Sequence, residues 1–85
     1  MELREALIKR IDKLLLEKGW RTSDLIRRSG VNQTTLTEIR QGRTKNPQLD
    51  TIDKIATGFG MTLADFFKDE VFEKEKPNYK FFEIK

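Results

Sequence analysis

The segment from 21 to 42, RTSDLIRRSGVNQTTLTEIRQG, constrains the fold more than any other part of the chain. Gly30 stands where a residue in the left-handed conformation ends one helix. Asn32 is a favourable N-cap for a second helix, because its side-chain oxygen can accept a hydrogen bond from a backbone N–H one turn further on. Leu36 and Ile39 lie three residues apart and define the inner face of that second helix. The segment therefore predicts two short helices joined by a tight turn, which is a helix-turn-helix.

Apolar residues at helical spacing continue on both sides of this segment. Gly19 and Gly60 end two of these runs, and Pro47 disfavours helical geometry at the residue before it, which predicts a polar loop at 43–47. Thr62 and Asp65 have the spacing of a capping box at the start of a last helix. Together these signals predict an all-α chain with five helices, at about residues 2–18, 22–29, 33–41, 49–59 and 63–71.

The composition excludes most enzyme chemistry. The chain has 85 residues, enough for one small hydrophobic core, and it contains no Cys and no His. Without them there is no thiol nucleophile, no thiolate or imidazole ligand for a metal, and no imidazole to act as a general base at neutral pH. We therefore expect a single domain that is not an enzyme and that has no metal site and no cofactor.

The N-terminal residues mix charged side chains into their apolar pattern, which is typical neither of a signal peptide nor of a membrane span. The lack of Cys also suits a reducing compartment. From these two features we expect a soluble cytoplasmic protein that makes no membrane contact.

Positive charge is concentrated on the helix-turn-helix. The whole chain has a net charge of +3, but residues 21–46 alone hold six Lys or Arg and only two Asp or Glu, a net of +4. Residues 47–69 hold two basic and four acidic side chains, a net of −2. A cationic surface opposed by an acidic one is what a duplex phosphate backbone would attract and orient, although surface Lys and Arg also serve solubility alone.

With these residues the chain resembles the phage-repressor family of helix-turn-helix regulators, also called Cro-like or XRE-like. The resemblance spans roughly residues 7–67. It is carried by Trp20, Gly30, Leu36, Ile39, Asn46-Pro47, Thr51-Ile52, Ile55-Ala56, Leu63 and Phe66-Phe67. It implies a compact five-helix bundle with the helix-turn-helix at its second and third helices. It also implies binding to operator DNA, commonly as a homodimer.

Two positions depart from the pattern of this family. Ile26 stands where the family usually has Ala at a close approach of two helices, and Arg21 stands where a Ser or Thr cap is usual. Thr22 is then the alternative cap for the second helix. The family also often has a basic residue after the Pro that reaches the minor groove, whereas this chain has Gln48, so no minor-groove contact is expected.

The recognition helix of such a motif enters the major groove with its N-terminus first, so its earliest outward residues reach the bases. Gln can bind the edge of adenine with two hydrogen bonds, and Thr can bond a base or touch a thymine methyl. Glu typically accepts a hydrogen bond from the amino group of cytosine, and it repels phosphate. The expected base contacts are Asn32, Gln33, Thr34, Thr37 and Glu38.

Groups that flank the recognition helix are expected to bind phosphate. The N-terminus of the second helix offers hydroxyls, unpaired backbone N–H groups and the positive end of the helix dipole. The expected phosphate contacts there and around the third helix are Thr22, Ser23, Thr35, Gln41, Arg43 and Lys45. Arg27, Arg28 and Arg40 are further candidates, each of which is alternatively a solvated charge.

The chain divides by composition into a helix-turn-helix domain at 1–72 and a C-terminal tail at 73–85. The tail is charged and broken by Pro77, and YKFFEIK after it alternates partly like a strand. Docking of Phe82 and Ile84 on the bundle, disorder, and self-pairing in a dimer all remain open.

The leading functional hypothesis is that the chain is a sequence-specific regulator that binds double-stranded DNA. The alternative is a protein-interaction or antitoxin-like module whose tail binds a protein partner.

Overall fold

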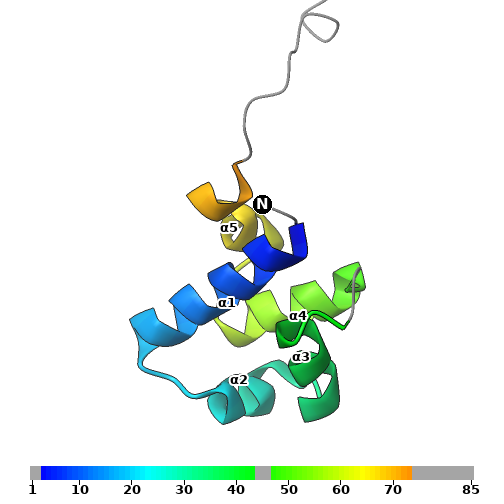
Figure 1. Cartoon of the computed structure of the whole chain (residues 1–85). Helices are drawn as coiled ribbons and strands as arrows, with labels where there is room; N and C mark the ends of the chain where they lie inside the picture. The colour runs from blue at the N-terminus through cyan, green and yellow to red at the C-terminus, as the bar shows by residue number, and fades with distance from the viewer. Residues whose placement is uncertain (1–2, 44–46, 74–85) are drawn as a thin grey trace, which may run out of the picture.

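A computed structural model describes residues 3–43 and 47–73, and in this part of the chain every regular element is helical. The elements are α1 (Leu3–Lys18), α2 (Thr22–Ser29), α3 (Gln33–Arg40), α4 (Leu49–Gly58), α5 (Leu63–Phe67) and the short 3₁₀ helix η1 (Glu70–Phe72). The predicted all-α five-helix bundle is confirmed. Figure 1 shows α2 and α3 together at one end of the bundle, and α5 and η1 at the other. Residues 74–85, on which the expectations for the tail fall, lie outside the described residues.

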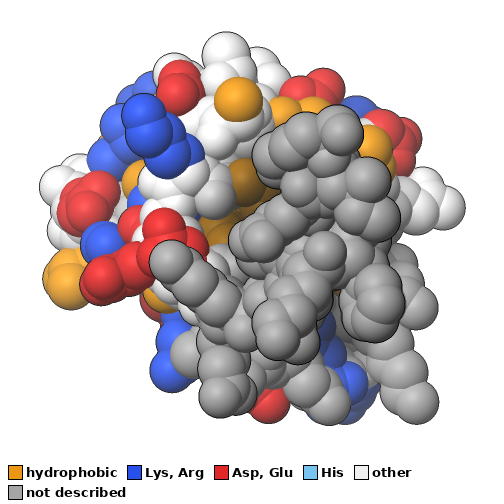
Figure 2. Space-filling model, turned by 90° about the horizontal axis from the view of Figure 1, so that it is seen from above, with side chains coloured by type: hydrophobic (Ala, Val, Ile, Leu, Met, Phe, Trp, Pro, Cys, Tyr) orange, Lys and Arg blue, Asp and Glu red, His pale blue; other side chains and the backbone are white. Residues whose placement is uncertain are grey.

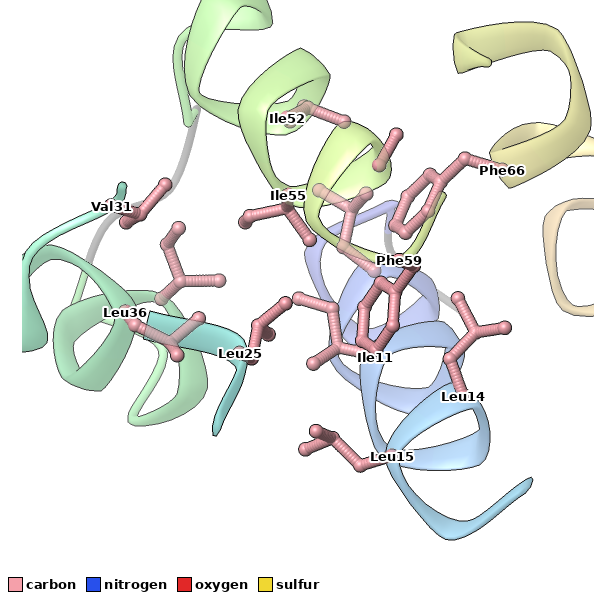
Figure 3. Close-up of a cluster of buried hydrophobic side chains, with 13 residues drawn as sticks. Ile11, Leu14, Leu15, Leu25, Val31, Leu36, Ile52, Ile55, Phe59 and Phe66 are labelled. Carbon is pink, nitrogen blue, oxygen red and sulfur yellow. The ribbon is translucent and has the colours of Figure 1, made fainter. Parts of the chain in front are cut away.

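Side chains from α1 to α5 and from the turn after α2 form one hydrophobic core. Leu25 and Leu36 have no exposed surface, although α2 and α3 are only eight residues long. Figure 3 shows Leu25 and Leu36 converging with Ile11 of α1 and Ile55 of α4. Helices this short are marginal in isolation, so burial of their apolar face is what holds them in place. The helix-turn-helix is therefore rigidly attached to α1 and α4.

The turn between α2 and α3 has the predicted geometry. Gly30 has φ 76°, and its N–H donates to the carbonyl of Ile26 at 3.1 Å. Val31 follows as a buried residue, and the Asn32 side chain caps α3. Because a side chain at a positive φ is strained, glycine is the residue that this turn requires. The bounds of α2 agree with the prediction, and α3 ends at Arg40 with Gln41 as its C-cap.

The start of α2 differs from the expectation that Thr22 caps it. Arg21 is the N-cap, with φ −92° and ψ 165°, and Thr22 is the first helical residue. The Arg21 side chain has no acceptor atom to offer, so the cap depends on Asp24, whose carboxylate accepts from the Arg21 N–H at 2.9 Å. This hydrogen bond, followed by the one from the Arg27 guanidinium, holds the pKa of Asp24 below its usual value. The Thr22 hydroxyl is thereby left for other contacts.

The last helix is shorter than predicted, because buried Arg10 of α1 binds its end. Arg10 Nε donates to the Phe66 carbonyl at 2.7 Å, and its NH2 donates to the Asp65 carbonyl at 3.1 Å. Its NH1 contacts Asp69 Oδ2 at 3.0 Å. A guanidinium takes the carbonyls that a continuing helix would have used for its next turns. The helix therefore ends at Phe67, and the predicted extension to residue 71 is wrong: Val71 belongs instead to η1.

Asp69 joins η1 to α1. Its Oδ1 accepts from the N–H of Val71 at 3.0 Å, while its Oδ2 accepts from Lys13 at 2.9 Å as well as from Arg10. The bond from the Val71 N–H, then that from Lys13, lowers the pKa of Asp69 below its ordinary value of 3.8. The charged carboxylate is thus the form that the folded state favours.

Acid is expected to remove this contribution. A carboxyl whose pKa is lowered by folding stabilises the protein fully above 3.8, and that stabilisation is lost as the pH falls below 3.8 through the folded value. Urea unfolding of the wild type and of Asp69→Asn at about pH 7 and about pH 2 tests this. The wild type should be the more stable at neutral pH, and the difference should shrink in acid. A difference that stays constant over this range would contradict it. Asp24, whose pKa is also lowered, leaves part of the acid sensitivity in the variant.

In residues 3–43 and 47–73 no helix combines the length and the apolar character needed to cross a membrane. Figure 2 looks onto the α5 end of the bundle and shows Lys and Arg side chains alongside Asp and Glu side chains on this face. The α5 end therefore carries both signs of charge.

Candidate nucleic-acid interface

The outer face of α3 presents a row of polar side chains. Gln33 and Thr34 in its first turn are exposed, and Thr37 and Glu38 one turn later are half-buried. With Arg43 these residues line a shallow hollow of about 300 Å³. The structure thus brings four of the five predicted base-reading residues together on one surface, with amide, hydroxyl and carboxylate groups in reach of the same ligand. These are the groups that recognise base edges.

Asn32, the fifth of these residues, has a structural role as well. Its side-chain oxygen accepts from the N–H of Thr35 at 2.7 Å and so caps α3. The cap engages the oxygen and leaves the amide N–H₂ as the group that can contact DNA. Thr35, expected to contact phosphate, is half-buried at this end of the helix.

The N-terminus of α2 places two hydroxyl groups beside α3. Ser23 is exposed and Thr22 is half-buried. The Thr22 oxygen accepts from Arg40 NH1, at the other end of α3, at 2.6 Å. A hydroxyl that accepts in this way still has its own hydrogen to donate. Both side chains therefore retain a donor for a phosphate.

The chain that follows α3 turns back along the helix. Gln41 is exposed at the C-cap, and the N–H of Arg43 donates to the Glu38 carbonyl at 2.9 Å. Arg4 of α1 donates to the Gly42 carbonyl at 3.3 Å and so ties this turn to α1. The Arg43 side chain is exposed. Lys45, the remaining expected phosphate contact, lies outside the described residues.

The three further arginines of the helix-turn-helix have protein partners. Arg27 pairs with Asp24 at 2.8 Å, and the Arg28 guanidinium lies 4.5 Å from the centre of the Trp20 ring. Arg40 bonds Thr22 and also pairs with Asp12 of α1, with 2.7 Å between NH2 and Oδ1. Arg27 and Arg28 are nevertheless exposed, so a protein partner does not remove them from solvent.

Two polar residues that matter for the position of α3 and α5 were missed by the sequence reasoning. Arg10 lies on the apolar face of α1, three residues after Leu7, and a charge within an apolar stripe is a signal of a buried hydrogen-bonded group. Asp12 gave no such signal, because its partner Arg40 is 28 residues away and nothing in the sequence pairs them.

Comparison with known proteins agrees with this geometry. The family described as Cro/C1-type HTH DNA-binding domains matches residues 10–71. A curated protein from Deinococcus deserti named HTH-type transcriptional regulator DdrOP3 is 31% identical over 62 residues, which cover 73% of this chain and 47% of that protein. The chain therefore aligns with about half the length of this relative. The family model matches residues 10–71, which is most of this chain, and the structure has the helix-turn-helix at α2 and α3. The chain therefore belongs to the family of Cro/C1-type helix-turn-helix DNA-binding domains.

Proposed function

We propose that the chain is a sequence-specific transcriptional regulator that binds double-stranded DNA with α3 in the major groove. The observation that carries this proposal is the hollow lined by Gln33, Thr34, Thr37, Glu38 and Arg43 on the outer face of the helix-turn-helix. Major-groove recognition needs a helix with polar side chains on its outer face, and these residues supply them. The match to a curated protein named as a transcriptional regulator supports the regulatory role.

Each group has a role in this proposal. Gln33 reads adenine with the oxygen and the N–H₂ of its side-chain amide, and Thr34 and Thr37 form a hydrogen bond with a base or touch a thymine methyl. Glu38 selects cytosine through its amino group. The amide N–H₂ of Asn32 contacts the base at the N-terminal edge of the site. These five side chains supply the sequence preference.

Phosphate contacts fix the position of α3 in the groove without reading sequence. Thr22, Ser23 and Thr35 donate to phosphate from the N-terminal ends of α2 and α3. Gln41, Arg43 and Lys45 hold the backbone from the C-terminal end of α3. The net charge of +4 on residues 21–46 adds the long-range attraction.

A single module of this size reads few base pairs, so we propose that two copies act together as a homodimer on a two-fold operator in the cytoplasm. In this arrangement residues 1–72 form the DNA-binding domain. Residues 73–85 are then a segment available for the contact between the copies or for a protein partner.

Selection of duplexes from a random pool at a stated salt concentration tests the proposal. A preferred site containing an adenine should emerge for the wild type. Recovery of sequences without any common preference, or no recovery of duplexes, would contradict sequence-specific binding.

Gln33→Ala is expected to weaken binding to the preferred site by about 1–3 kcal/mol and to relax the preference at one base position. The reason is the loss of both hydrogen bonds to one adenine. Fluorescence anisotropy on the selected duplex and on four duplexes that vary that base measures the effect. Equal loss on all four duplexes would show that Gln33 does not read a base.

Arg43→Ala is expected to weaken binding to all duplexes alike and to reduce the salt slope of the binding constant by about 1, because one phosphate contact is lost. A titration over salt concentration on the preferred duplex and on a scrambled one measures both. Arg43 lines the same hollow as Gln33 and Glu38, so a contact between Arg43 and a base is the alternative to a phosphate contact. A loss confined to the preferred duplex would assign Arg43 to a base instead of a phosphate.

A further inference from the structure

One guanidinium connects all three helices around the proposed interface. Arg40 is the last residue of α3, and its NH1 donates to the hydroxyl oxygen of Thr22, the first residue of α2, at 2.6 Å. Its NH2 donates to Asp12 Oδ1 of α1 at 2.7 Å. The two bonds use two different nitrogen atoms of one planar group. The position of the guanidinium is therefore set from two directions.

Stability alone gives little reason for this arrangement. The side chains of Arg40 and Asp12 are 35% and 46% exposed, and exposed ion pairs contribute little to folding. The core packing of Leu36 and Ile39 already attaches α3 to the bundle. What the arrangement does determine is the orientation of the Thr22 hydroxyl.

A hydroxyl group has one hydrogen to donate and two lone pairs that accept. Arg40 has no acceptor, so in its contact with Thr22 the hydroxyl must act as the acceptor. The hydrogen of Thr22 then points away from Arg40 and is free to donate. At the N-terminus of α2, beside the polar face of α3, such a donor suits a phosphate oxygen.

We propose that Arg40 is a positioning residue for DNA binding: Asp12 holds its guanidinium, and the guanidinium orients the Thr22 hydroxyl as a donor to a DNA phosphate. The acidic side chain of Asp12 then supports the binding of a polyanion. The inference rests on the proposed function, because it requires α2 and α3 to face DNA. The alternative is a direct contact, in which Arg40 itself binds phosphate and Asp12 only competes with the phosphate for Arg40.

The sign of the effect at Asp12 separates these two possibilities. Removing an acidic side chain raises the net charge by one, which by long-range attraction alone tightens binding to DNA. If Asp12 only competes with phosphate for Arg40, Asp12→Ala tightens binding further. If Asp12 positions Arg40, Asp12→Ala weakens binding although the protein becomes more positive.

The experiment measures the affinity for the selected duplex by fluorescence anisotropy at fixed salt, after circular dichroism has confirmed that each variant is folded. We expect Asp12→Ala to weaken binding about three- to tenfold, the range of one lost hydrogen bond. Glu17→Ala is the matched control, since Glu17 is an exposed acid of the same helix and its loss changes the charge equally. It should leave binding unchanged or slightly tighter. Asp12→Asn keeps an oxygen that accepts from Arg40, and it should retain wild-type affinity.

The Thr22→Val background completes the test. With no hydroxyl left to orient, the further change Asp12→Ala should no longer weaken binding. Tighter binding by Asp12→Ala in the wild-type background, or weakening that persists in Thr22→Val, would overturn the positioning role while DNA binding itself stands. If the wild type selects no duplex, the proposed function fails first and the inference fails with it.

Discussion

Arg10→Met is expected to lower the free energy of unfolding by about 3 kcal/mol, because removal of one partner of a buried ion pair leaves the other uncompensated. The Arg10 and Asp69 side chains are each 7% exposed. The variant also removes the Arg10 donor from the Phe66 carbonyl, and it leaves the Asp65 carbonyl with only the Lys68 N–H. Lys13 still contacts Asp69, which keeps the effect at the lower end of the range for buried pairs. Met is chosen because it retains the long apolar stem of Arg.

Lys13→Met is the matched control for this prediction. It removes a cation from the same carboxylate by the same substitution, but the Lys13 side chain is 44% exposed and does not bond the end of α5. Only a small effect is expected from it. Urea unfolding followed by circular dichroism measures both variants. Equal effects of the two substitutions would mean that Arg10 acts on Asp69 by charge alone and not as the donor that ends α5.

The helix-turn-helix was predictable because its signals are local. All of these signals lie between Gly30 and Ile39. Gly30 ends one helix and Asn32 caps the next, so each acts on the backbone beside it. The same holds for Thr62, whose hydroxyl accepts from the Asp65 N–H at 3.1 Å as expected for a cap. The family resemblance and the five-helix bundle were predicted on these grounds, and the match to a family of Cro/C1-type helix-turn-helix domains and the five observed helices confirm them.

The features that could not be predicted depend on contacts between distant residues. The end of α5 is set by Arg10, which binds the Phe66 carbonyl from 56 residues away. The apolar stripe that continues to Val71 predicted a longer helix, since periodicity contains no information about a guanidinium that binds the last carbonyls. Arg40 is a similar case: its charge was recognised, but its partners on α1 and α2 were not.

For the candidate site, the sequence indicated which residues face outward but not how they are held. The inward positions of Leu36 and Ile39 place Thr34 on the opposite side of α3 and Gln33 beside the inner face, and both are exposed. The double use of Asn32 as a cap and as a candidate base contact also follows from its position. The roles of the individual side chains toward DNA stay predictions.

A close contact between α2 and α4 leads to the second large expected effect. Gly58, the last residue of α4, is buried against Ser29, the last residue of α2. A Cβ atom at Gly58 would lie 2.7 Å from the Cβ of Ser29, 2.9 Å from its Cα and 3.0 Å from its N. Atoms of the backbone cannot turn aside as the end of a side chain can. Any residue other than glycine must therefore push the two helices apart.

Gly58→Ala is accordingly expected to destabilise the protein by about 3 kcal/mol, at the upper end of the usual range for overpacking, although Ala is the better helix former. Thr57→Ala is the control, since Thr57 is exposed in the same turn and its substitution should stay within about 0.5 kcal/mol. Thermal and urea unfolding of both variants test this. Similar stability of the two variants would show that α4 approaches α2 less closely.

Because Ser29 immediately precedes Gly30, a displaced α2 also shifts the turn that positions α3. Gly58→Ala should therefore weaken DNA binding even at temperatures where the variant is folded.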